Sequence, residues 1–338
     1  MPNWCSWTCF GRTSTPATSP LPSPPSTSVN AASVRVLAEA VSASPADPAA
    51  KKPRNWRDLR LRLISAAILA PLGLLCVGLG SWPFVGLVLV GMVGLGSEWA
   101  GMLQQPARSL RGIVLLAWPA IACIATLTVG RWNEALLMLL APLALGPWIG
   151  IGSVAIGIGG IGLLWLRFAT GSGYDGVLFV ILVVWASDTF AYVAGRAIGG
   201  PKLAPRISPG KTRSGSLGGL AGAMLVGAVL ALLLPSPVGA AASALRGLGF
   251  GLLLGIASQA GDLAESAFKR RCGVKDSGRS IPGHGGLLDR FDGLLAAAPL
   301  AAMLSLAAPT GQGFWYAGVQ AVSPPASPSG PASSVPKD

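Results

Sequence analysis

Long stretches without any charged residue most constrain what this 338-residue chain can fold into. Only 11% of its residues are Asp, Glu, Lys or Arg, whereas a soluble domain averages about 25%. Each stretch can hold at least one membrane span of roughly 20 residues, and none alternates apolar and polar residues as a membrane barrel strand does. The stretches are 63–97, 112–130, 135–166, 214–245 and 293–336. The sequence therefore predicts an all-α fold, a polytopic transmembrane helical bundle.

We expect about nine spans in this bundle. Region 133–167 is rich in glycine, so it is also compatible with one span plus a re-entrant piece. The expected spans are 63–80, 82–103, 112–129, 133–149, 151–167, 176–198, 215–235, 245–264 and 289–309. Pairs of glycines four residues apart, such as Gly251 and Gly255, predict close packing between helices.

The excess of basic residues, a formal net charge of +12, first indicates topology. The basic residues of 51–62 precede the first span and predict an anchor on the cytoplasmic side. Nine spans then place the basic loops 104–111, 200–214 and 265–288 in the cytoplasm as well. Positive charge also suits anionic lipid headgroups or nucleotides, and nothing in the sequence favours nucleic acid.

The two ends of the chain are predicted to be tails. Residues 1–50 are rich in Ser, Thr, Pro and Ala and cannot bury enough apolar surface to fold. They resemble a transit peptide, but a disordered tail is the favoured interpretation. Residues 310–338 form a C-terminal tail. The five scattered cysteines and the single histidine, His284, exclude a disulfide framework, a zinc site and a His-rich metal centre.

Acidic residues concentrate where the chain is otherwise apolar. Six of the 13 acids fall between residues 188 and 292, and an ionisable group within a span indicates function. On a helix Asp262, Glu265 and Lys269 share one face, as do Asp289 and Asp292. Two such faces suit Mg²⁺, which uses one or two carboxylates plus substrate phosphates. Salt bridges to neighbouring Lys and Arg residues are the alternative.

The loop between these acids is glycine-rich and basic. Glycines before a helix start let backbone N–H groups approach an anion. The residues concerned are Gly283, His284, Gly285 and Gly286, with Lys269, Arg270, Lys275 and Arg290 nearby. Together they predict a polyphosphate held through Mg²⁺.

A second basic loop contains Gly210-Lys211-Thr212. It is not a P-loop, because Pro205 stands where that motif needs glycine and no strand is expected before it. Ser208 and Lys211 are still candidates for phosphate contacts.

At these residues the sequence resembles the phosphatidate cytidylyltransferase (CDP-diacylglycerol synthase) family. The resemblance covers 176–309 well and 63–175 less well, where Glu98 is a family-like landmark. One departure is Ser214, where the family often has an acid. The matching residues are Ser266, Lys269-Arg270, Lys275-Asp276, Pro282-Gly283-His284-Gly285-Gly286 and Asp289-Arg290-Phe291-Asp292, with Ser187-Asp188, Ala191-Tyr192, Gly195-Arg196, Ile207-Ser208-Pro209 and Gly261-Asp262-Leu263 upstream.

The resemblance implies that CTP and phosphatidic acid give CDP-diacylglycerol and pyrophosphate with Mg²⁺ at the lipid bilayer. It makes 176–309 the catalytic region and 63–175 the N-terminal membrane helices. A bacterial inner membrane, with the site facing the cytoplasm, is expected, and a homodimer is left open. The attacking phosphate monoester has a second pKa of about 6, so it needs no strong base, and catalysis rests on positioning and charge stabilisation.

Roles follow for the single residues. Asp262 and Asp289 are assigned as metal ligands, with Asp292 assisting. His284 contacts phosphate or pyrophosphate in preference to acting as a general base. Asp188 either joins the site or pairs with Arg196. Phosphate binding is assigned to Ser208, Lys211, Lys269, Arg270, Lys275, Gly285, Gly286 and Arg290.

Two other functions compete with this interpretation. A CTP-dependent lipid kinase, such as a polyprenol kinase, would need the same Mg²⁺, basic loops and membrane lipid, but its substrate attacks the γ-phosphorus. A transporter would spread its acids through the spans and carry an internal repeat. The acids cluster in the C-terminal third, which disfavours the transporter.

Overall fold

The computed structural model describes residues 56–278, 280, 285–309 and 311–319. They belong to one unit of the chain, 55–338. The predicted tail 1–50, the first residues of the predicted anchor 51–62 and most of the tail 310–338 lie outside the described residues.

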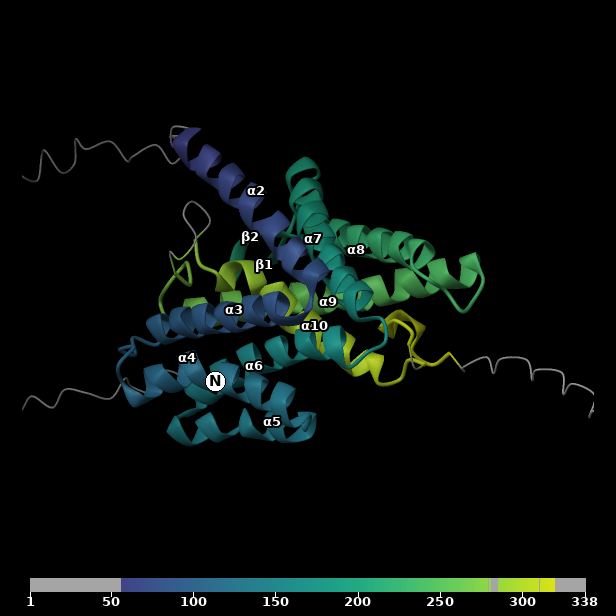
Figure 1. The fold of residues 1–338 in the computed structure, drawn as a ribbon. Coiled ribbons are helices and arrows are strands. Elements are labelled where there is room, and N and C mark those ends of the chain that lie inside the picture. The colour runs from purple at the N-terminus through teal and green to yellow at the C-terminus, as the bar shows by residue number, and fades with distance from the viewer. Residues whose placement is uncertain (1–55, 279, 281–284, 310, 320–338) are drawn as a thin grey trace, which may run out of the picture. The chain divides into compact units, whose positions relative to one another are not determined.

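Helices make up most of the described chain (Figure 1). The predicted helical fold is therefore confirmed. The helices are α2 (Trp56–Leu79), α3 (Ser81–Met102), α4 (Leu110–Val129), α5 (Trp132–Met138), α6 (Pro147–Phe168), α7 (Gly173–Ala197), α8 (Arg213–Leu233), α9 (Ala240–Arg271) and α10 (Leu288–Ser305), with short 3₁₀ helices η1 (Ala141–Leu145) and η2 (Phe314–Tyr316).

Six of the described helices are long and apolar enough to cross a membrane: α3, α4, α6, α7, α8 and α9. The predicted count of nine is not confirmed by this measure. In α2 the apolar part that is described, Ala70–Leu79, is shorter than a span. Helix α10 is 18 residues long and begins with three charged residues, Asp289, Arg290 and Asp292.

The span predicted over 133–149 is wrong as a single helix. The structure has α5 and η1 there, and the chain turns at Gly146, whose φ of +133° favours glycine. Pro147 then starts α6, at a position where its missing N–H breaks no helical hydrogen bond. The α5–η1 segment lies antiparallel along α6, because Trp132 contacts Trp165 while Leu143 packs against Gly150.

Close packing of α8 against α7 and α9 confirms the role expected of the paired glycines. A Cβ at Gly251 would lie 2.4 Å from the carbonyl oxygen of Ala223, and one at Gly219 would lie 2.8 Å from that of Ser187. Backbone meets backbone at both positions, so any side chain would push the helices apart.

The basic loop after α7 folds into a small antiparallel hairpin, which the all-α prediction did not include. Strand β1 (Lys202–Ala204) pairs with β2 (Ser208–Thr212). Thr212 ends the hairpin and caps α8, where its hydroxyl accepts a hydrogen bond from the Gly215 N–H at 3.1 Å. The hairpin is thereby joined directly to the start of α8.

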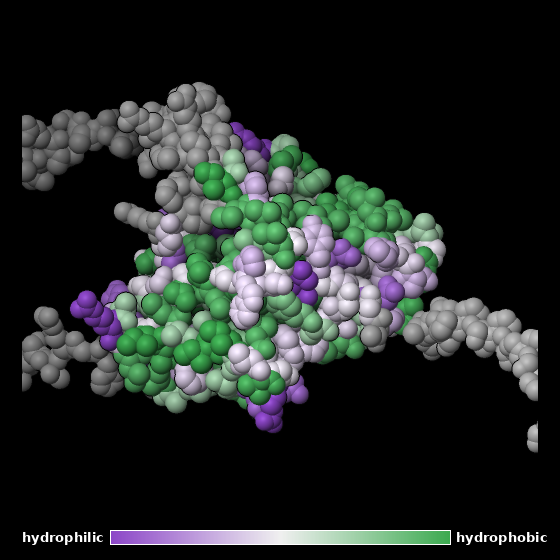
Figure 2. Space-filling model, viewed as in Figure 1, coloured by the Kyte–Doolittle hydropathy of each residue, from purple (hydrophilic) through white to green (hydrophobic). Residues whose placement is uncertain are grey.

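Large apolar side chains cover much of the outer surface (Figure 2). Trp82, Val90 and Leu233 are each more than 70% exposed on helices of this unit. An exposed apolar surface of this extent suits a lipid environment. With the six apolar helices, it makes this an integral membrane protein.

Candidate active site

Charged side chains from four elements border one cavity of about 500 Å³. The elements are α7, the hairpin strand β2, α9 and the start of α10. A polar hollow of this kind is uncommon in a domain whose helices are so apolar, which makes it the candidate functional site. Its charged lining residues are Asp188, Arg196, Lys211, Asp262, Lys269, Asp289, Arg290 and Asp292.

Helix α9 contributes the predicted face. Lys269 is buried, and its Nζ lies 2.7 Å from a carboxylate oxygen of Glu265, one turn earlier. Glu265 is itself buried, and neither of its oxygens accepts a well-formed hydrogen bond from a described residue. This carboxylate is therefore held by its ion pair with Lys269, and most of its hydrogen-bonding capacity is unused.

Asp289, in the first turn of α10, holds the other side of Lys269. Its Oδ1 lies 2.5 Å from Lys269 Nζ, and its Oδ2 accepts hydrogen bonds from the backbone N–H groups of Gly286, at 3.0 Å, and Ser277, at 3.3 Å. Both carboxylate oxygens are thus engaged by the protein. The cation on α9 and the loop before α10 are fixed to each other through this one side chain.

Three acids come together beside this pair. Carboxylate oxygens of Asp262, Glu265 and Asp292 all lie within 4.8 Å of one another. Two of them are in the ion pairs that the sequence offered as the alternative, Asp262 with Lys211 and Glu265 with Lys269, which offset part of their mutual repulsion. The spacing of the three also suits a hard divalent cation that binds oxygen ligands.

Cations approach the acids from the hairpin and from α10. Lys211 of β2 forms an ion pair with Asp262, and Arg290 lines the same cavity. Asp188 of α7 faces it too, along with Arg196, so both sequence alternatives for Asp188 remain compatible with its place. The cavity thus brings acids and basic groups together.

Other predicted phosphate-binding residues lie elsewhere. Arg270 donates to the backbone carbonyls of Ile207 and Val274, at 3.2 Å each, so it ties the hairpin to the loop after α9. Lys275 is exposed. Neither residue lines the cavity, and Ser208 does not either.

The two predicted loop glycines have conformational roles in the structure. Gly285 has a φ of +83°, in the region that favours glycine. The N–H of Gly286 is occupied by Asp289. His284, with Pro282 and Gly283, lies outside the described residues.

Sequence reasoning missed roles for three residues near the site. Glu265 was placed on the face that suits Mg²⁺ but was not assigned as a ligand. Gln259, one turn before Asp262, accepts from the Ser216 hydroxyl at 2.5 Å and donates to the Ser216 carbonyl at 3.0 Å, which fixes α9 against α8. Glu98, from α3, accepts hydrogen bonds in the loop before α10. The helical spacing of Gln259 and Glu265 from Asp262 was the available signal.

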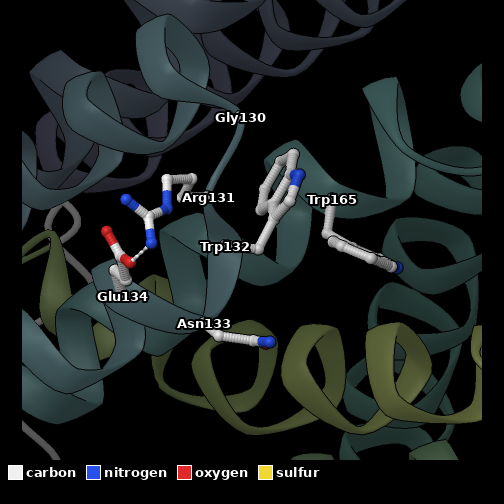
Figure 3. A pocket seen from close by; sticks show the side chains of 6 residues that line it. All are labelled: Gly130, Arg131, Trp132, Asn133, Glu134 and Trp165. Atoms are coloured by element: carbon white, nitrogen blue, oxygen red, sulfur yellow. Dashed lines mark ion pairs between the residues drawn. The ribbon is translucent and has the colours of Figure 1, made fainter.

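A second hollow, of about 340 Å³, lies beside the α4–α5 junction (Figure 3). Trp132 and Trp165 line it in an edge-to-face contact, and its acid, Glu134, is paired with Arg131. This hollow lacks the cluster of acids and cations that the larger cavity has. Cys272, at the end of α9, is no activated nucleophile either, because burial raises the pKa of its thiol despite the opposing charge of Arg271.

The cavity and the helices around it form the candidate active site of an integral membrane protein. Known sequences agree: the profile of the cytidylyltransferase family matches residues 60–307. The chain belongs to the cytidylyltransferase family.

Several curated relatives of this chain are phosphatidate cytidylyltransferases. A phosphatidate cytidylyltransferase of Brucella abortus (strain 9-941) is 38% identical over 252 residues, which are 72% of this chain and 92% of that protein. The phosphatidate cytidylyltransferase of Pseudomonas aeruginosa is 35% identical over 270 residues, 74% of this chain and 98% of that protein. One from Staphylococcus saprophyticus is 44% identical over 141 residues, 42% of this chain and 53% of that protein.

Proposed function

We propose that this protein transfers the cytidylyl group of CTP to phosphatidic acid, giving CDP-diacylglycerol and pyrophosphate. The names of its relatives support this activity. The observation that carries it is the cavity, where acids and cations from four elements meet in an apolar membrane domain. Such a site can hold a charged nucleotide next to a lipid whose acyl chains stay in the bilayer.

The chemistry asks for positioning more than for proton transfer. An oxygen of the lipid phosphate forms a bond to the α-phosphorus of CTP, and the bond from that phosphorus to the bridging oxygen of pyrophosphate breaks. A phosphate monoester is largely dianionic at neutral pH, so it attacks without a strong base. In our proposal Lys211, Lys269 and Arg290 neutralise phosphate charge and align the two substrates.

We further propose Mg²⁺ at Asp262, Asp292 and Glu265. The donor set fits, because all three offer carboxylate oxygens close together and those of Glu265 have only the Lys269 ammonium as a close partner among the described residues. When bound, Mg²⁺ supplies charge neutralisation for the departing pyrophosphate. Asp289 was predicted as a ligand, but its contacts with Lys269 and the loop favour a supporting role.

We infer that the cavity faces the cytoplasm of a bacterial inner membrane and that the chain crosses nine times. The bacterial relatives support the membrane, and the basic hairpin beside the cavity supports the side. The antiparallel course of α5 and η1 along α6 supports a further crossing. In a cysteine-free background, Lys202→Cys should react with an impermeant thiol reagent only from the cytoplasm and Arg131→Cys only from outside.

Purified protein in detergent tests the reaction directly. With phosphatidic acid, Mg²⁺ and CTP labelled at the α-phosphorus, label should enter the lipid as pyrophosphate is released in equal amount. A CTP-dependent lipid kinase would leave that label in CDP, and this result would replace the proposed function. Omitting phosphatidic acid is the control, since pyrophosphate release without lipid would mean simple CTP hydrolysis.

A further inference from the structure

Glu98 sits far from the signature in sequence but is buried against it. It belongs to α3, one turn before that helix ends, and is 5% exposed. Its Oε1 accepts hydrogen bonds from the Leu287 N–H, at 2.7 Å, and the Ser280 hydroxyl, at 2.5 Å. Its Oε2 accepts from the Leu288 N–H and the Ser277 hydroxyl, each at 2.8 Å. One carboxylate thus takes four hydrogen bonds from one loop and the helix that follows it.

This carboxylate acts as the cap of α10. The N-cap residue, Leu287, has no side chain able to accept a hydrogen bond, so the first N–H groups of α10 need an acceptor from elsewhere. A negative charge at a helix N-terminus is also favoured by the helix dipole. Hydrogen bonds to an ionised acceptor are stronger than those to a neutral one.

Two glycines of the loop pack closely against the Glu98 side chain. A Cβ at Gly278 would lie 2.7 Å from Glu98 Oε1, and a Cβ at Gly286 would lie 2.6 Å from Oε2 and 1.8 Å from the Ser277 hydroxyl. Real Cβ atoms do not approach other atoms so closely. These glycines are therefore required by the buried carboxylate, whatever the loop binds.

The loop that Glu98 holds also contacts residues of the cavity. Ser277 and Gly286, both packed on Glu98, donate their N–H groups to Asp289, and Asp289 holds Lys269 at 2.5 Å. Asp289 and Lys269 line the cavity, whereas Glu98 does not. An unbroken chain of contacts joins α3 to the cation on α9.

We propose that Glu98 is a positioning residue for the reaction, acting through the loop before α10 to set the places of Asp289 and Lys269. This inference rests on the proposed function, because its activity assay measures the proposed reaction. Loss of the carboxylate leaves four donors competing for fewer acceptors, which shifts the loop and the start of α10. A displacement of about 1 Å at a catalytic group can cost on the order of 100-fold in rate.

The first variant is Glu98→Gln, which keeps the size of the side chain but offers one acceptor oxygen and an NH₂ group that faces donors. We expect kcat per folded molecule to fall about 10- to 100-fold, with KM for CTP changed much less. Folded protein is counted by size exclusion and thermal unfolding in the same detergent. Glu134→Gln is the matched control, since Glu134 pairs with Arg131 at the other hollow, and it should keep full activity.

A purely structural role gives a different result. It predicts less folded protein but an unchanged kcat for the molecules that do fold, and this outcome would overturn the proposal. If Glu98→Gln yields no folded protein, Ser277→Ala removes a single donor to the same carboxylate. Its kcat per folded molecule should still fall, and a wild-type value would also overturn the proposal.

Hydrogen exchange separates this proposal from the proposed reaction. In Glu98→Gln the amides of Ser277, Gly286, Leu287 and Leu288 should exchange faster than in the wild type, whatever the substrate. Faster exchange with no activity in the wild type would mean that the reaction is misassigned but the coupling is right. Unchanged exchange at these amides would refute the coupling itself.

Discussion

Replacing Glu265 by Gln tests which carboxylates hold the metal. The substitution keeps the shape of the side chain and removes one of the three charges whose oxygens lie within 4.8 Å of one another. Lys269 keeps its contact with Asp289 at 2.5 Å, so no uncompensated charge is left behind. The penalty of about 3–5 kcal/mol for breaking a buried ion pair therefore does not apply in full.

The size of the effect follows from these contacts. Glu265 is buried and accepts no well-formed hydrogen bond from a described residue, so its neutralisation also removes a desolvation cost. We expect the free energy of unfolding to change by no more than about 1 kcal/mol. The apparent affinity for Mg²⁺ should fall by at least about 10- to 100-fold, since even residues behind the ligands have effects of that size.

Asp289→Asn is the matched comparison. Asn cannot accept from Lys269, Gly286 and Ser277 with two oxygens, so kcat and stability should fall, but the Mg²⁺ concentration needed for half-maximal activity should change little. Both variants are followed by Mg²⁺ titration of activity and by Mn²⁺ binding measured by electron paramagnetic resonance. The reverse pattern, with the metal requirement raised in Asp289→Asn alone, would refute the reasoning and restore Asp289 as a ligand.

Two further predictions concern packing and nucleotide binding. Gly247→Val should destabilise the protein by about 1–3 kcal/mol in thermal unfolding, because its Cβ would lie 2.3 Å from the Gly227 carbonyl oxygen. Gly249→Val is the control, since a Cβ there meets open space and should cause no such loss. Equal destabilisation by both substitutions would contradict the packing argument. Lys211→Ala should raise KM for CTP about tenfold, the effect of roughly 1.4 kcal/mol of lost binding. Lys202→Ala, on the same hairpin but outside the cavity, should leave KM unchanged; no difference between the two would contradict a nucleotide contact at Lys211.

How much could be predicted from the sequence depended on how far apart the interacting residues lie along the chain. A run of apolar residues and the spacing of Asp262, Glu265 and Lys269 are local, so the helices and the charged face of α9 followed from them. The partners of Glu98 lie 179 to 190 residues away, and no local pattern indicates them. The hairpin over 202–212 was missed for a related reason, because its two short strands are stabilised by their joint attachment to α8 and α9.

The start of α10 gives its two acids, Asp289 and Asp292, different surroundings. Both lie on one face of α10, three residues apart. Asp289 is in the first turn, beside loop N–H groups that have no helical partner, and two of these hydrogen-bond to its carboxylate. Asp292 lies one turn further on, where its Oδ1 accepts a hydrogen bond from the N–H of the next residue, Gly293, at 2.6 Å, and its carboxylate lies beside Asp262 and Glu265 instead of the loop. In such a pair, we expect the first acid to order the loop and the second to face the substrate.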